Sequence, residues 1–309
     1  MSADDKECVL FEVVHGSQAF GLSGPDSDVD LKGVIVGPLS WYSGFLDAPE
    51  QIQLSKDHTR YDIRKFFRLA ADTNPTAIEM LWAPDDCVKI ISPLGERIIS
   101  YRQDFLSQRV ADSFGNYAIS QLKRIKTHRR WLLNPPKAEP KRSDFKLPEK
   151  SLISNDQMGA ADALIERGDI SDDLLSPNFL LILDRERSYR VARREWEHYH
   201  AWKRERNPVR AKQEEKFGYD TKHAQHLVRL LRMSFEILST GQVIVRRPDR
   251  EDLLEIKQGA WEFDKLIEYA EHMHEKVREA RNMSSLPEDS DREKLNEMCS
   301  EIVREARYR

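Results

Sequence analysis

The first hundred residues combine short apolar runs with turn-forming residues, which is typical of strands alternating with helices. Residues 9–14 and 29–36 are rich in β-branched side chains and lie near glycines, so both predict strands. Residues 51–54 alternate polar and apolar side chains and favour a third strand, although the wider stretch 50–61 fits no single period. Residues 62–71 carry apolar side chains at helical spacing and predict a helix with one buried face.

After about residue 110 the apolar spacing becomes helical. Apolar side chains from Phe114 to Ile125 repeat at helical intervals, and this helix should end before the Asn134-Pro135 step. Residues 134–150 contain four prolines and many charges, which predicts a loop or a mobile insertion. Further helices are expected within 155–183, 191–205, 219–238 and 262–309, the last interrupted near 284–287.

These patterns predict an α+β protein with three parts. Residues 1–110 would form the α/β catalytic domain, and residues 111–270 a helical substrate-binding domain that contains the proline-rich insertion. Residues 271–309 are polar and helical in pattern, and we expect them to fray or to act as an interaction surface.

Composition narrows the class of protein. The 309 residues include 49 Lys and Arg against 53 Asp and Glu, and this net charge of −4 argues against broad, nonspecific nucleic-acid binding while allowing a local basic site. No apolar run approaches the roughly 18–20 residues of a membrane span. The acidic N-terminus is unlike a signal peptide, so we expect a cytoplasmic protein without a membrane partner. The cysteines lack metal-ligand spacing and predict reduced thiols, at Cys8, Cys87 and Cys299.

The strongest chemical signal lies between the first two predicted strands. Gly16 and Ser17 follow the first strand, where glycine permits a sharp turn and the serine hydroxyl and free amides can hold a phosphate. Asp28 and Asp30 are two residues apart, so on a strand both carboxylates would lie on one face and could bind divalent cations. The alternative is that the two aspartates cap a turn or face solvent. The spacing of the glycines matches neither a Walker loop nor a dinucleotide-binding fingerprint.

The stretch HGSQAFGLSGPDSDVDLKGV, which starts at His15, resembles the signature of nucleotidyltransferases of the DNA polymerase β superfamily. Together with 57–82 and 216–238, it resembles more narrowly the bacterial and phage RNA repair pathway DNA polymerase β family, over most of residues 9–245. The resemblance implies a polymerase β-like domain, with a small mixed sheet and flanking helices, followed by a mostly helical domain. It also implies a third metal-binding carboxylate, for which Asp57 is preferred and Asp62, a candidate helix cap, is the alternative.

The predicted helix at 221–238 has an apolar side and a basic side. Lys222, His226 and Arg229 are spaced i, i+4 and i+7, and this stripe would suit a triphosphate or a nucleic-acid phosphate. The alternative is an ordinary solvated helix face. His223 with His226 could also suggest a metal site, but no third ligand of that kind is evident.

The activity implied is transfer of a nucleoside monophosphate from an NTP, such as ATP, to a hydroxyl group, with release of pyrophosphate. Gly16 and Ser17 would hold the triphosphate, with the stripe of Lys222, His226 and Arg229. Asp28, Asp30 and Asp57 would be the catalytic, Mg²⁺- or Mn²⁺-binding residues. The family name implies RNA, as a tRNA or an RNA end, as the acceptor. The alternatives are a protein or small-molecule acceptor, as in toxin-like and antibiotic-modifying enzymes, and a non-enzymatic nucleotide sensor.

Overall fold

The chain folds into two compact units that do not follow the sequence in order. The computed structural model describes residues 7–25, 27–151, 153–167 and 176–307. Unit 1 comprises Met1–Lys126 and Asp220–Arg309, and unit 2 comprises Thr127–Tyr219. This division differs from the boundaries at residues 110 and 270 that composition suggested, because the C-terminal helices pack in the same unit as the sheet.

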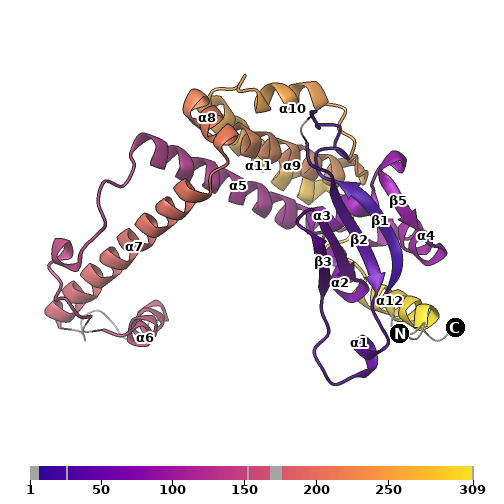
Figure 1. Cartoon of the computed structure of the whole chain (residues 1–309), viewed down its shortest axis with the longest axis horizontal. Helices are drawn as coiled ribbons and strands as arrows, with labels where there is room; N and C mark the ends of the chain where they lie inside the picture. Colours follow the sequence, from indigo (N-terminus) through magenta and orange to yellow (C-terminus); the bar gives the residue numbers. More distant parts are fainter. Residues whose placement is uncertain (1–6, 26, 152, 168–175, 308–309) are drawn as a thin grey trace. The chain divides into compact units, whose positions relative to one another are not determined.

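Unit 1 is built on a five-stranded sheet in the order β3-β4-β2-β1-β5 (Figure 1). Strand β1 pairs antiparallel with both β2 and β5, and β4 pairs antiparallel with β3. Strands β2 and β4 are parallel, so the sheet is mixed, as the resemblance implied. The strands are β1 Cys8–His15, β2 Asp30–Val36, β3 Gln51–Ser55, β4 His58–Asp62 and β5 Val88–Ile91.

Capped helices follow the strands and bury one face of the sheet. Helix α2, Ile63–Ala71, begins at Asp62, whose side chain accepts a hydrogen bond from the backbone N–H of Arg64. Its buried face includes Phe66, whose ring packs edge-on against Phe11 of β1 at 5.5 Å between centroids. The other short helices of this region are α1 Ser40–Ser43, α3 Pro75–Leu81, α4 Pro93–Ser100 and the 3₁₀ turns Asp85–Cys87 and Arg102–Phe105.

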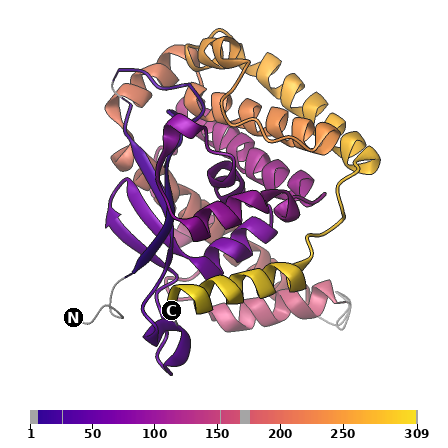
Figure 2. The same ribbon diagram turned by 90° about the vertical axis from the view of Figure 1, so that its right-hand side faces the viewer.

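The C-terminal helices complete unit 1. Helix α9, Thr221–Thr240, packs against α10, Arg250–Lys257, and α11, Phe263–Met283. Helix α12, Arg292–Arg307, lies beside α2, as Figures 1 and 2 show. Residues 292–307 are therefore a packed part of the sheet unit, which the polar sequence of this segment did not predict.

Unit 2 is helical. Helix α5 spans Val110–Leu133, and its part from Thr127 onward belongs to unit 2. The other elements of this unit are the 3₁₀ turn Arg142–Phe145, α6 Asn155–Glu166, α7 Pro177–Glu205 and α8 Pro208–Phe217. Trp131 of α5 packs against Tyr199 and Trp202 of α7, with ring centroids 6.0 and 5.4 Å apart. The proline-rich insertion is tied to α7, because the Arg142 guanidinium forms an ion pair with the fully buried Glu186.

Candidate active site

The loop after β1 and the start of β2 meet at one end of the sheet. His15, the last residue of β1, lies directly opposite Asp30, the first residue of β2. Residues 16–22, which follow β1, form a compact turn rather than a helix, with the Phe20 N–H donating to the Gly16 carbonyl and the Leu22 N–H to the Ser17 carbonyl. The predicted phosphate loop is therefore fixed by its own backbone hydrogen bonds.

Gly16 allows this turn to approach Asp30 closely. Its φ of +71° lies in the left-handed region, and a Cβ at this position would lie 2.6 Å from Asp30 Oδ2. Glycine is thus required both by the backbone conformation and by the carboxylate beside it. The Gly-Ser turn and the candidate metal ligand Asp30 form one structural unit.

Four of the predicted site residues line one cavity. It has a volume of about 340 Å³ and is lined by Ser17, Gly24, Pro25, Ser27, Asp28, Asp30, Lys222 and Lys257. The motif Ser-Asp-x-Asp thus meets the phosphate loop and a basic side chain from α9. Lys257 was not predicted, because no local pattern distinguishes it from the other lysines of a polar helix. Gly16, Asp57, His226 and Arg229 are not among the described residues of this lining.

The two aspartates of the cavity suit a divalent cation. Within the described chain, neither Asp28 nor Asp30 has a basic side chain within ion-pair distance. Two carboxylates that form no direct ion pair repel each other across one cavity, and a hard cation with oxygen ligands would relieve that repulsion. The space that Gly16 leaves beside Asp30 keeps this carboxylate accessible from the loop. The residues present therefore fit the metal that the family implies.

Asp57 and Asp62 lie at opposite ends of β4. Because β2 and β4 are parallel, with Leu31 opposite His58 and Ile35 opposite Asp62, Asp57 lies beside the start of β2. The Asp57 carbonyl accepts a hydrogen bond from the Leu31 N–H at 2.7 Å. The Asp62 carboxylate caps α2, pairs with the Arg64 guanidinium at 2.8 Å and accepts from the Tyr42 hydroxyl at 2.6 Å. Asp57 thus lies at the end of the sheet that carries Asp30, whereas the Asp62 carboxylate is engaged by the helix cap, Arg64 and Tyr42.

Two helices bring the basic side chains to the cavity. Lys222 lies in the first turn of α9, where the Asp220 carboxylate accepts the His223 N–H as an N-cap. Lys257 ends α10, and its carbonyl accepts a hydrogen bond from the Thr221 hydroxyl at 2.8 Å. The ends of α9 and α10 are thus joined beside the carboxylates. Ammonium groups so placed can bind phosphate oxygens.

The predicted basic stripe does not continue as an exposed surface along α9. Arg229 is only 2 % exposed and forms an ion pair with the buried Glu79 of α3. The ring Nδ1 of His226 lies 3.2 Å from the Arg229 guanidinium. Burial, helped by the charge of Arg229, lowers the pKa of His226 to about 3, so this side chain is neutral near pH 7. Of the three residues, Lys222 alone lines the cavity.

A comparison with known families addresses the region that carries the loop and the carboxylates. The model of the RNA repair pathway DNA polymerase beta family matches residues 2–134. This part of the chain is therefore similar to that family. The match includes the whole sheet and the loop, and it ends before α9 and α10. The similarity to the RNA repair pathway DNA polymerase beta family suggests a nucleotidyltransferase-like function for this region.

Comparison with curated proteins adds a phage relative of this family region. The chain is 34% identical over 87 residues to an uncharacterized 38.9 kDa protein in the nrdC-mobD intergenic region of Enterobacteria phage T4. The alignment covers 24% of this chain and 25% of the phage protein. No solved structure matches the chain significantly. In the described part of the chain, none of the helices has both the length and the apolar character of a membrane span.

Proposed function

We propose that the protein transfers a nucleoside monophosphate from an NTP to a hydroxyl acceptor and releases pyrophosphate. One observation carries the proposal: Ser17, the Asp28–Asp30 pair and Lys222 line a single cavity beside the family's Gly-Ser turn. A phosphate-binding turn, two carboxylates and an ammonium group are the combination that phosphoryl-group transfer needs. The family match supports this reaction class.

In this reaction the acceptor oxygen forms a bond to the α-phosphorus, and the bond from that phosphorus to the β-phosphate oxygen breaks. Pyrophosphate leaves with the bonding electrons, and the hydroxyl proton passes to a base. We assign the base role to Asp57, whose backbone lies beside the start of β2. Gly16 and Ser17 would bind the triphosphate, and Lys222 and Lys257 would neutralise its charge.

The proposed cofactor is Mg²⁺ or Mn²⁺, held by Asp28 and Asp30 with Asp57. When bound, such a cation activates the attacking oxygen and stabilises the charge on the leaving group. The protein supplies the anionic ligands and, through Gly16, the space for their close approach to the loop.

The family name makes an RNA end the first acceptor to test. The same chemistry serves protein and small-molecule acceptors in other polymerase β-type enzymes, and fold alone does not choose among them. Incubation of the protein with labelled NTP and magnesium, first with total RNA and then with cell protein, separates these acceptors by where the label appears. An NTP- and magnesium-dependent rise in melting temperature without label in any acceptor would instead indicate a sensor.

The proposal is tested by Asp28→Asn and Asp30→Asn, with Asp47→Asn as the matched control. Asp47 is exposed and lies outside the lining of the cavity. Metal-assisted stabilisation of several kcal/mol corresponds to at least about a hundredfold in rate. In both site variants we expect label transfer to be slower by at least about a hundredfold, with melting temperatures close to that of the parent. The control should transfer label at the parent's rate. Undiminished turnover in either site variant would contradict the proposed metal site.

A further inference from the structure

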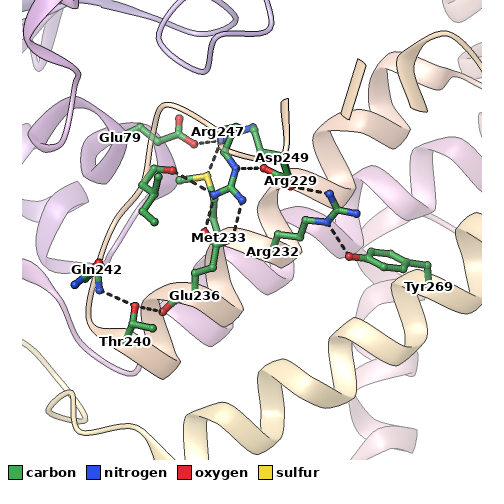
Figure 3. A network of polar contacts seen from close by, with 11 residues as sticks. Glu79, Arg229, Arg232, Met233, Glu236, Thr240, Gln242, Arg247, Asp249 and Tyr269 are labelled. Atoms are coloured by element: carbon green, nitrogen blue, oxygen red, sulfur yellow. Dashed lines mark hydrogen bonds and ion pairs between the residues drawn. The ribbon is translucent and has the colours of Figure 1, made fainter. Parts of the chain in front are cut away.

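A buried polar chain connects the loop after β1 to helix α9. His15 Nε2 lies 3.0 Å from one carboxylate oxygen of Glu79, and the other oxygen pairs with the Arg229 guanidinium at 2.5 Å. Glu79 and Arg229 are 3 % and 2 % exposed. Figure 3 shows the two side chains meeting between α3 and α9. These polar contacts therefore connect the end of β1, through Glu79 of α3, with helix α9, which begins only at Thr221.

The guanidinium of Arg229 also holds the loop directly. It lies over the ring of Phe20, 3.7 Å from the centroid. Its remaining contacts are with His226 Nδ1 at 3.2 Å and Met233 Sδ at 3.1 Å, both from the same helix. Phe20 in turn packs edge-on against His15, with centroids 5.8 Å apart. The start and the middle of the loop thus contact one buried ion pair.

Burial of this ion pair has a free-energy cost, because both charges lose their hydration. Burial alone would raise the pKa of Glu79, but the charge of Arg229 and the contact with His15 lower it to about 2, so the carboxylate is ionised. Such pairs are often replaceable by apolar residues of similar volume without loss of stability. Stability alone therefore gives a weak reason for charges at this place. Orientation of the groups that the pair touches gives a stronger one.

Those groups belong to the candidate active site. His15 is the residue directly opposite Asp30 in the sheet, and it immediately precedes Gly16. A shift of His15 or Phe20 would move the turn that borders the Asp30 carboxylate. Displacement by about 1 Å of groups that orient a substrate can cost on the order of a hundredfold in rate.

We infer that Glu79 and Arg229 are positioning residues, which fix the loop from His15 to Phe20 against α9 and so hold the Gly-Ser turn beside Asp30. The inference rests on the proposed function for its catalytic consequence. Its structural part, the ordering of the loop by the ion pair, stands independently of any activity. Neither residue touches the cavity, so neither is assigned to catalysis.

The test separates orientation from stability by replacing both charges. Glu79→Gln alone leaves Arg229 buried without its partner, and this single variant can unfold. The double variant Glu79→Leu/Arg229→Met keeps the volume, removes both charges and should melt close to the parent. The matched control is the double variant Glu186→Leu/Arg142→Met, which makes the same exchange at a buried ion pair of unit 2.

The first readout is amide hydrogen exchange in residues 16–22. In the double variant we expect exchange at least about tenfold faster than in the parent, as for a locally opened segment. The control should leave this exchange unchanged. Loop exchange equal to that of the parent, in a folded double variant, overturns the inference.

The second readout is the split between kcat and KM for the NTP. A misplaced turn should lower kcat at least about tenfold in the double variant, with a smaller change in KM. Equal kcat in a double variant with a loosened loop overturns the catalytic consequence. A loosened loop in a protein whose parent transfers no nucleotide supports the ordering role and overturns the proposed function, so the two failures are distinguishable.

Discussion

At the scale of single residues, the site depends on one close approach between a backbone and a carboxylate. Gly16 lies so near Asp30 that no side chain fits between them. The proximity brings a turn that can bind phosphate next to a ligand that can bind metal. A divalent cation held by Asp30 would therefore lie close enough to the turn to neutralise charge on a triphosphate bound there.

Gly16→Ala should therefore damage the site more than the fold. Gly16 and Gly241 both have positive φ values, +71° and +68°, so alanine strains both backbones similarly, by about 1–2 kcal/mol. A Cβ at Gly16 meets Asp30 Oδ2, whereas nothing lies within 4 Å at Gly241. Both variants should melt slightly below the parent, and Gly16→Ala alone should lose the stabilisation by NTP with magnesium in a thermal shift assay. Equal ligand responses in the two variants would show that the contact with Asp30 is irrelevant to binding.

The structure brings together those candidate residues that belong to one local motif. Ser17, Asp28 and Asp30 lie within a short stretch, and the structure brings them to one cavity. Arg229 was misread as an exposed member of a basic stripe, because a helical projection contains no information about Glu79, 150 residues away in sequence. Lys257 gave no signal, since its place beside the cavity depends on how α10 packs against α9.

At the scale of elements, strand β4 assigns different roles to two similar aspartates. Asp57 precedes the strand and lies beside the end of the sheet that carries Asp30. Asp62 ends the strand and starts α2, with its carboxylate occupied by the cap, Arg64 and Tyr42. The parallel pairing of β2 with β4 creates this division.

Exchange of each carboxylate for an amide should separate these roles. Asp57→Asn should reduce nucleotide transfer at least about tenfold while the melting temperature stays near that of the parent, because the proposed base is lost from a half-buried position at the start of the strand. Asp62→Asn keeps a side chain that can cap α2 but removes the charge that pairs with Arg64 and accepts from Tyr42, and should destabilise the protein by about 1–3 kcal/mol. Chemical denaturation and a rate measurement on both variants check this. The reverse pattern, with a stable but inactive Asp62→Asn, would make Asp62 the third carboxylate.

The sequence predicted those helices whose apolar periodicity extends over many residues and those strands that are rich in β-branched side chains. Strands β1, β2 and β3 and helices α2, α5 and α9 occur where the pattern predicted them. Helix α7 begins at Pro177 instead of near residue 191, because the Ser176 cap and the N-terminal proline start it earlier than its apolar pattern indicates. Strand β5 has only four residues and is set by pairing with β1, which local sequence does not encode.

At the scale of the whole molecule, helix α12 and the segment before it pack against the N-terminal part of unit 1. The Ser290 hydroxyl donates to the Ala71 carbonyl, and the Gln108 N–H donates to the Pro287 carbonyl. Arg97 of α4 pairs with Glu305 of α12 at 3.0 Å. These contacts connect the last helix with the region matched by the family. The high polarity of residues 271–309 concealed this, because only Leu295, Cys299 and Ile302 of α12 are buried, and this narrow stripe is enough to dock the helix.

That stripe gives the last prediction. Leu295, Cys299 and Ile302 recur at spacings of four and three on α12, and Ile302 is fully buried. Ile302→Ala should lower the free energy of unfolding by about 2–5 kcal/mol, because the substitution removes buried apolar atoms and leaves a cavity that the neighbouring side chains cannot fully fill. Glu301→Ala changes an exposed neighbour on the same helix and should have an effect within about 0.5 kcal/mol. Urea unfolding of both variants measures the difference. If α12 were a detached tail, both substitutions would leave the unfolding midpoint unchanged, because neither would alter a contact with the sheet unit. A lower midpoint in Ile302→Ala alone would instead mean that the C-terminal helix shares the cooperative unfolding of the unit that carries the candidate active site.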